Sequence, residues 1–224
     1  MKKILFSLAL AFAATSVVQA QEAVYSNVVG MVKKTLMAEK FIFVQYPFIF
    51  EDDATPSVED LLPDVAVGTI VYFWDSGIQE YKTVQKLTPS FWNPPNQNVV
   101  RGIGFYVVLP AGATDQDLVL SGEVPDDTEY PETILTLQPG FNAVGNPYPT
   151  EITIENSGIQ DATNPGDQVA FWDPEQSNFV FVQKLTPTFW NPPNVTIPVG
   201  SAVFLQVATG VDIVSTPNYS LTND

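Results

Sequence analysis

The stretch VQKLTPSFWNPPN at residues 84–96 recurs almost unchanged as VQKLTPTFWNPPN at residues 182–194. Only Ser90 and Thr188 differ between these two segments, which we call the FWNPPN tracts. Each tract opens with β-branched and apolar residues and ends in two prolines, which fix the backbone and lack the amide protons that a sheet requires. Each tract is therefore predicted to be a strand that runs into a stiff loop.

The correspondence continues on both sides of the tracts at the same offset of 98 residues, the difference between positions 182 and 84. VYFWD at residues 71–75 matches VAFWD at 169–173, and GIGFYV at 102–107 matches GSAVFL at 200–205. We therefore interpret the chain as a tandem duplication of a unit of about a hundred residues, in which each copy can hold its own core.

The first twenty residues have the pattern of a secretory signal peptide. Lys2 and Lys3 precede an apolar run, and the small-residue sequence VQA at residues 18–20 is typical of a cleavage site. We expect export to the periplasm or the extracellular space. The expected organisation is a signal peptide at 1–20, unit 1 at 21–123, an acidic junction with two prolines at 124–132, and unit 2 at 133–224.

Short segments rich in β-branched and aromatic residues, separated by turn residues, indicate an all-β fold in each unit. In unit 1 these segments are 41–48, 68–74, 80–87, 103–109 and 117–120. The 19 prolines of the chain argue against long helices. One helical turn is expected at 57–62, where Ser57 can cap the first turn and Asp60 can complete a capping box. We expect two β-sandwich or small-barrel units.

The composition limits the chemistry of the chain. The sequence contains no histidine and no cysteine, and its formal net charge is −16. Disulfides, Ser-His-Asp and Cys-His catalysis and nearly all zinc sites are excluded. The negative charge disfavours nucleic acid as a partner. No segment after the signal peptide is apolar and long enough to suggest membrane insertion.

Acidic loops such as Glu51 to Asp53 and the pair Asp115 and Asp117 leave paired-carboxylate catalysis and weak calcium binding open. The acidic triplet has no counterpart in unit 2, and no EF-hand string occurs. We predict no catalytic residue, no metal site and no cofactor.

The aromatic residues of the FWNPPN tracts allow two interpretations. In the first, Trp92 and Trp190 close the end of each β core, and each packs against the strand that follows. Gly102 and Gly104 in that strand lack side chains that would block the Trp92 indole, and Gly200 and Ala202 are their counterparts in unit 2. In the second, the two indoles stack on sugar rings while Asn93 and Asn191 bind sugar hydroxyls. Both interpretations remain open from the sequence.

The segment GFNAVGNPYP at residues 140–149 resembles the "G-W-N-L-I-G-N-P-Y" opening of β-rich repeats in secreted bacterial proteins. Those repeats continue with motifs like VAFWD at 169–173 and PVGSAVF at 198–204. The resemblance implies a secreted or surface-associated module and supplies no catalytic residues. We expect a non-enzymatic structural or interaction protein with envelope proteins or polysaccharide as partners, or alternatively a carbohydrate-binding module that uses the FWNPPN tracts.

Overall fold

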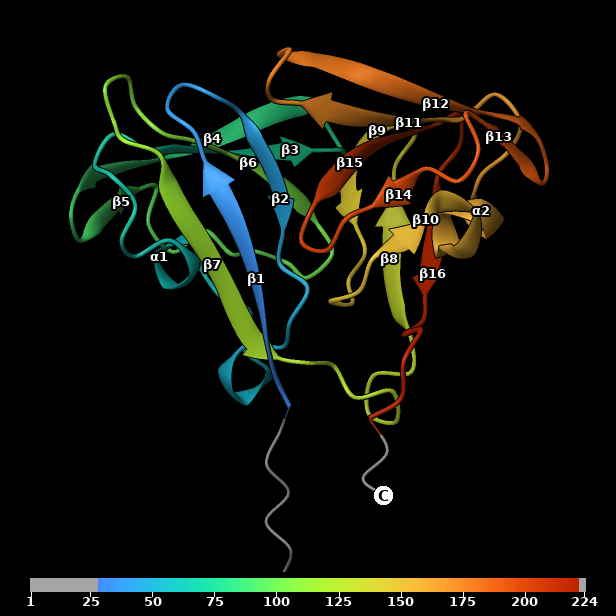
Figure 1. Ribbon diagram of the computed structural model, residues 1–224, viewed down its shortest axis with the longest axis horizontal. Coiled ribbons are helices and arrows are strands. Elements are labelled where there is room, and N and C mark those ends of the chain that lie inside the picture. Colours follow the sequence, from blue (N-terminus) through green and yellow to red (C-terminus); the bar gives the residue numbers. More distant parts are fainter. Residues whose placement is uncertain (1–27, 222–224) are drawn as a thin grey trace, which may run out of the picture.

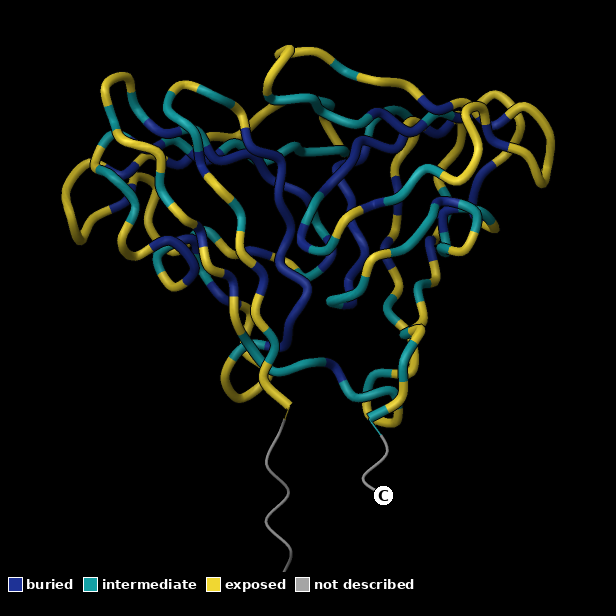
Figure 2. Tube along the Cα trace, viewed as in Figure 1, coloured by how far each residue is buried: buried dark blue, intermediate teal, exposed yellow. Residues whose placement is uncertain are grey.

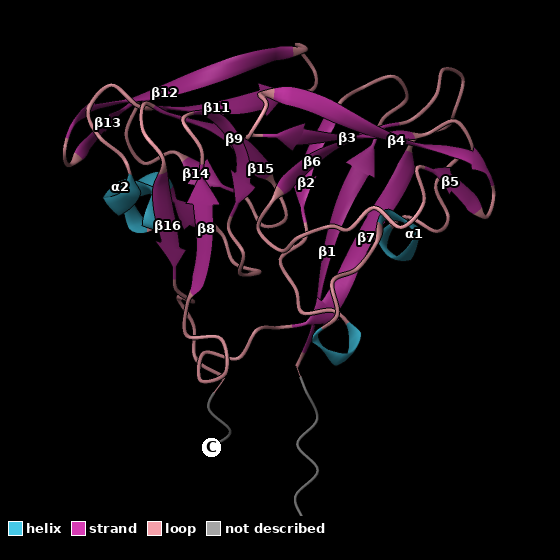
Figure 3. Ribbon diagram, turned by 180° about the vertical axis from the view of Figure 1, so that it is seen from behind, coloured by secondary structure: helices cyan, strands magenta, loops and turns pink. Residues whose placement is uncertain are grey.

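A computed structural model describes residues 28–221, and the expected signal peptide at 1–20 lies outside this range. The described chain is built from antiparallel β-strands with a few short helical turns, which confirms the all-β prediction (Figure 3). No helix between residues 28 and 221 is long and apolar enough to cross a membrane.

Unit 1 consists of a five-stranded sheet and a two-stranded ribbon. The strand order of the sheet is β2 (Ile42–Gln45), β6 (Gly104–Val108), β3 (Ile70–Asp75), β4 (Glu80–Thr88) and β5 (Phe91–Asn93). The ribbon pairs β1 (Val29–Leu36) with β7 (Gln116–Glu123). The β3–β4 hairpin and β6 are antiparallel neighbours, so aromatic side chains of different strands align on one face.

Unit 2 has the same arrangement. Its sheet has the order β9 (Gly140–Gly145), β15 (Ala202–Val207), β11 (Gln168–Asp173), β12 (Asn178–Thr186) and β13 (Phe189–Asn191). Its ribbon pairs β8 (Thr133–Leu137) with β16 (Val211–Ser215), and a small extra ladder joins β10 (Ile152–Thr153) to β14 (Thr196–Ile197). The two units lie side by side, with the first and last described residues on the same side of the molecule (Figure 1).

The helical segments are short. They are η1 (Glu51–Asp53), α1 (Val58–Leu61), η2 (Ile154–Asn156) and α2 (Gly158–Ala162). The predicted cap is confirmed, because the Ser57 hydroxyl accepts from the Asp60 amide while the Asp60 carboxylate accepts from the Ser57 amide.

Each five-stranded sheet has two apolar faces. In β3, Val71 and Phe73 pack into the core of unit 1 beneath the β1–β7 ribbon, whereas Tyr72 and Trp74 point to the opposite face. That second face packs against unit 2 rather than against solvent. Each unit is thus a two-layer structure, and no sheet within the described range closes into a barrel, so the small-barrel alternative is wrong.

The two units meet through reciprocal contacts. The indole Nε1 of Trp74 donates to the Phe141 carbonyl at 2.7 Å, and Trp172, its counterpart in unit 2, donates to the Phe41 carbonyl at 2.7 Å. Two isolated backbone bridges between the units are also equivalent: Val44 of unit 1 pairs with Ser201 of unit 2, and Val144 of unit 2 pairs with Ile103 of unit 1. Such exchange of equivalent partners is the geometry of a two-fold interface. Figure 2 shows that buried backbone gathers where the units meet.

Glycines make this close approach possible. A Cβ at Gly104 would lie 2.5 Å from the Ala202 Cβ, and one at Gly102 would lie 3.0 Å from the Pro147 Cβ, both across the interface. The expectation that these glycines make room for the Trp92 indole is therefore wrong. They make room for unit 2.

Candidate functional site

The structure places both FWNPPN indoles inside the protein. Trp92 is 2 % exposed and Trp190 is 0 % exposed, and each belongs to the core of its own unit. Asn93 and Asn191 are exposed at the ends of β5 and β13. The ring faces that would stack on a sugar are covered by protein atoms, so the tracts present no indole platform at the surface.

Within each tract, a buried lysine pairs with the tryptophan. The Nζ of Lys184 lies 5.6 Å from the Trp190 ring centroid and donates to the Gln160 carbonyl and, at 2.9 Å, to the Thr163 carbonyl at the end of α2. The Trp190 Nε1 donates to the Gln160 Oε1 at 2.7 Å. The lysine thus satisfies carbonyls that the helix leaves free.

Unit 1 repeats this lysine and tryptophan pair. The Lys86 Nζ lies 5.7 Å from the Trp92 centroid and donates to the Pro63 carbonyl, just beyond α1. Desolvation lowers the pKa of both lysines, and nearby carboxylates, Asp64 in unit 1 and Asp161 and Asp167 in unit 2, oppose that shift. Both copies of the tract therefore act inside their own unit, where they join β4 or β12 to a helical turn.

Carboxylate chemistry finds little support in the structure. Across residues 28–221, no three carboxylate residues gather in a way that could hold a metal ion. The triplet Glu51 to Asp53 forms the exposed η1 turn. These acidic residues are solvated rather than directed into a shared site.

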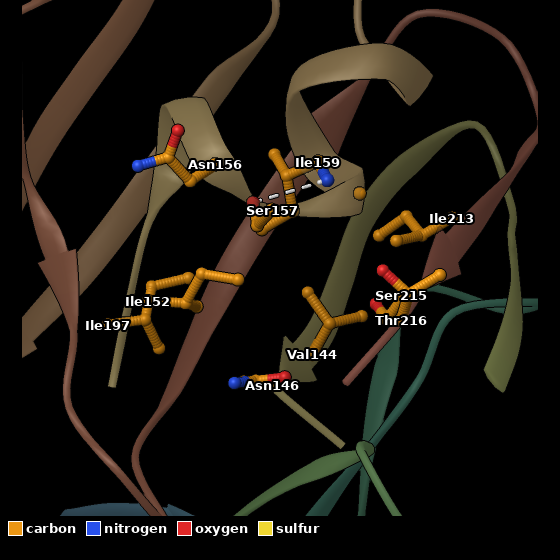
Figure 4. Close-up of a pocket in the computed structure, with 12 residues that line it drawn as sticks. Val144, Asn146, Ile152, Asn156, Ser157, Ile159, Ile197, Ile213, Ser215 and Thr216 are labelled. Atoms are coloured by element: carbon orange, nitrogen blue, oxygen red, sulfur yellow. Dashed lines mark hydrogen bonds between the residues drawn. The ribbon is translucent and has the colours of Figure 1, made fainter. Parts of the chain in front are cut away.

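Unit 2 also holds a small cavity between its helical turns and the strands β9, β14 and β16. Val144, Ile159 and Ile213 contribute apolar atoms to its lining, and Asn146 and Ser157 contribute polar atoms (Figure 4). Its volume of about 30 Å³ leaves room for water. It is too small to bind a substrate or cofactor.

An aromatic pocket lies where the two units meet. It has a volume of about 200 Å³, opens to solvent, and has walls that are almost entirely apolar. Six of its seven lining residues are aromatic. They are Trp74 of β3, Tyr81 of β4, Phe141 of β9, Phe179 and Phe181 of β12 and Phe204 of β15, together with Ala170 of β11.

The β3–β4 hairpin positions two of the lining side chains, Trp74 and Tyr81. The Asp75 carboxylate accepts from the Gly77 amide at 2.9 Å and fixes the β3–β4 turn, because an aspartate at a turn can bond the backbone two residues on. The register that follows sets Trp74 opposite Tyr81, with ring centroids 4.8 Å apart. Tyr81 remains 46 % exposed at the mouth of the pocket, and partial burial raises the pKa of its hydroxyl.

The buried ring of Phe204 is the centre of the pocket wall. It stands nearly perpendicular to three neighbours, at interplanar angles of 84° to Trp74, 82° to Phe141 and 69° to Phe179. The centroids of these three rings lie 5.5, 6.0 and 5.9 Å from its own. These rings contact Phe204 in edge-to-face arrangements, and all four line the pocket.

One difference between the units accounts for the pocket. Ala170 pairs with Phe204 and Phe181 in the unit 2 sheet, and the equivalent residue of unit 1 is Tyr72, which pairs with Tyr106. The Tyr72 ring lies 5.3 Å from that of Phe41 and occupies the matching space of unit 1. Alanine at position 170 leaves that space empty in unit 2.

Sequence reasoning missed this pocket entirely. None of its lining residues was predicted as a site, because each was assigned to a strand and its facing partner was unknown. A signal was nevertheless present: VYFWD at 71–75 carries aromatics on both strand faces, and position 170 replaces one of them by alanine. A strand with apolar side chains on both faces needs a packed layer on each side of its sheet.

Comparison with known proteins adds no further assignment. No protein-family model matches the chain, and searches of curated proteins and of solved structures likewise gave no significant match.

Proposed function

We propose that the chain is a non-enzymatic, exported interaction protein that binds its partner through the aromatic pocket between its two units. The observation that carries this proposal is the pocket itself, an opening of about 200 Å³ with aromatic walls in a protein whose other large aromatics are mostly packed. Concave, mainly apolar openings between structural units are typical ligand sites.

The chemistry of the walls supports binding over catalysis. Among residues 28–221, Tyr81 is the only titratable residue that lines the pocket, and the Trp74 Nε1 is already bonded to the Phe141 carbonyl. A general acid and base pair, a nucleophile with its base, or a set of metal ligands would need polar groups that these walls lack.

Export rests on the sequence. The signal-peptide pattern at residues 1–20 and the resemblance to repeats of secreted bacterial proteins both favour a protein of the bacterial envelope or its surroundings. The carbohydrate-binding alternative at the FWNPPN tracts is less favoured, because Trp92 and Trp190 are buried.

A ligand screen tests this proposal. The wild type and an Ala170→Tyr variant, which fills the pocket as Tyr72 fills the matching space of unit 1, are titrated with a panel of small neutral, cationic and anionic compounds. Tryptophan fluorescence reports the pocket through Trp74, and thermal melting reports stabilisation by bound ligand. Compounds should bind the wild type and fail to bind Ala170→Tyr.

A Tyr72→Phe variant is the matched control, because it keeps the unit 1 ring and leaves the pocket unchanged; it should bind like the wild type. The proposal is wrong if every compound that binds the wild type binds Ala170→Tyr equally well, or if no compound of the panel binds the wild type.

A further inference from the structure

The aromatic pocket offers ring surface and almost nothing else to a ligand. The π-face of an aromatic ring carries partial negative charge, so several rings around one space attract a cation held between them. Phe204 with its three nearly perpendicular neighbours, together with Tyr81 and Phe181 at the rim, provides six such rings. The pocket therefore has the composition of a cation-binding aromatic box.

The charges around the pocket also favour a cation. No lysine or arginine of the described part of the chain lines the pocket. Among the neighbours in sequence of Trp74 and Tyr81 are Asp75, Glu80 and Lys82, and the lysine is held by Asp75 at 2.6 Å. With a net charge of −16 on the chain, the potential at the mouth favours cations and repels anions.

Among the described lining residues, the Tyr81 hydroxyl at the mouth is the one side-chain acceptor, and this scarcity of acceptors selects the kind of cation. A primary ammonium group enters a site without loss only if its N–H donors find acceptors, and a metal ion needs oxygen ligands. The Phe141 carbonyl beside the pocket already accepts from the Trp74 indole and from the Gln79 side chain. A quaternary ammonium group carries its charge on methyl groups and has no N–H donors, so it gives up no hydrogen bonds on entering.

We propose that the aromatic pocket binds a small quaternary ammonium group, such as a trimethylammonium head group. This inference rests on the proposed function, because it names the ligand class for the same pocket. The volume of about 200 Å³ is below the usual range for a drug-sized ligand, so the head group enters while the rest of the ligand stays at the surface.

Three probes that share a hydroxyethyl group test the inference by calorimetry and tryptophan fluorescence. Choline carries a trimethylammonium group, 3,3-dimethylbutan-1-ol carries a neutral tert-butyl group of the same shape, and ethanolamine carries a smaller, primary ammonium group. Choline should bind the wild type roughly tenfold more tightly than either of the other two compounds. Added sodium chloride should weaken the binding of choline and leave that of the neutral compound unchanged.

Two variants locate the binding. Ala170→Tyr should abolish choline binding by filling the pocket. Phe181→Thr introduces the residue that unit 1 carries at the equivalent Thr83, so it removes one exposed ring with little risk to folding, and it should weaken choline binding several-fold. Phe189→Ala removes a similarly exposed phenylalanine outside the pocket and should bind choline like the wild type. Circular dichroism checks that each variant is folded.

The outcomes separate this inference from the proposed function. If the neutral compound binds the wild type as tightly as choline, and Ala170→Tyr loses both, the ligand class is wrong while the pocket remains a binding site. If choline fails to bind the wild type while other panel compounds bind it, the ligand class is again wrong. If Ala170→Tyr and Phe181→Thr both bind choline like the wild type, choline binds outside the aromatic pocket. The proposed function and the ligand class are then both wrong.

Discussion

Replacing Trp190 with alanine should lower the free energy of unfolding by about 3–5 kcal/mol. Trp190 is fully buried in unit 2, lies over the Lys184 ammonium group and donates its Nε1 to the Gln160 side chain. Alanine would leave a cavity beside a buried charged group. The substitution therefore tests whether the FWNPPN tracts act in folding.

The magnitude follows from the buried surface. A buried tryptophan removes about 150–250 Å² from water, which at about 25 cal/mol per Å² corresponds to roughly 4–6 kcal/mol. That figure is an upper bound, since the unfolded chain already covers part of the side chain. The lost bond to Gln160 adds little, because this side chain is partly exposed and water can replace the indole donor.

Urea unfolding followed by circular dichroism measures the effect, with the slope of the transition checked for two-state behaviour. Phe189→Ala is the control. Phe189 precedes Trp190 in β13, is 44 % exposed, and should cost less than about 1 kcal/mol. Equal stability of the Trp190→Ala and Phe189→Ala variants would refute the structural role. Loss of sugar binding with stability retained would instead favour the indoles as a platform.

Two further predictions concern buried polar groups. Lys184→Met should lower the free energy of unfolding by about 1–3 kcal/mol, and by more than Lys86→Met does. The reason is that the Lys184 ammonium group donates to acceptors on two residues and the Lys86 ammonium group to an acceptor on one. Equal urea midpoints of the two variants would contradict this prediction. Burial raises the pKa of Tyr46 and Tyr219 to about 12 from 10.0. The folded protein then keeps protons that the unfolded chain releases, so unfolding free energy should fall between about pH 10 and 12, and Tyr46→Phe should reduce that fall.

Local features of the fold could be predicted from the sequence because their causes are local. The Ser57 cap depends on side chains three residues apart, and the turn after Trp74 depends on the carboxylate of Asp75. The strands β4 and β12 begin at Glu80 and Asn178, and the first of these starts where the pattern predicts. Such local interactions form whatever the rest of the chain packs against them.

Strands without a strong pattern were missed. The ribbon strand β1 (Val29–Leu36) contains two lysines and a glycine, and Phe91–Asn93 was assigned to a loop before the prolines. The strand β5 forms by turning back onto β4, which directly precedes it, whereas β1 forms because a distant strand supplies its hydrogen bonds. The partner of β1 is β7, which starts about eighty residues later, and the sequence of β1 alone does not predict this pairing.

The interface could not be predicted for a related reason. IVYFW at residues 70–74 is a continuous apolar run, so periodicity does not distinguish the face that covers its own core from the face that meets unit 2. The same ambiguity produced the error at Gly102 and Gly104. A small residue indicates a close neighbour, but only the packed structure shows that the neighbours are Pro147 and Ala202 rather than the Trp92 indole.

The position of the pocket follows from having two units in one chain. In a symmetric dimer of identical chains, any residue that opens a pocket at one place opens it at the equivalent place too. In a single chain with two units, Tyr72 can fill one space while Ala170 empties the other. Each FWNPPN tract packs in the core of its own unit, whereas residues at the interface face each other and can differ, and the aromatic pocket forms where they do.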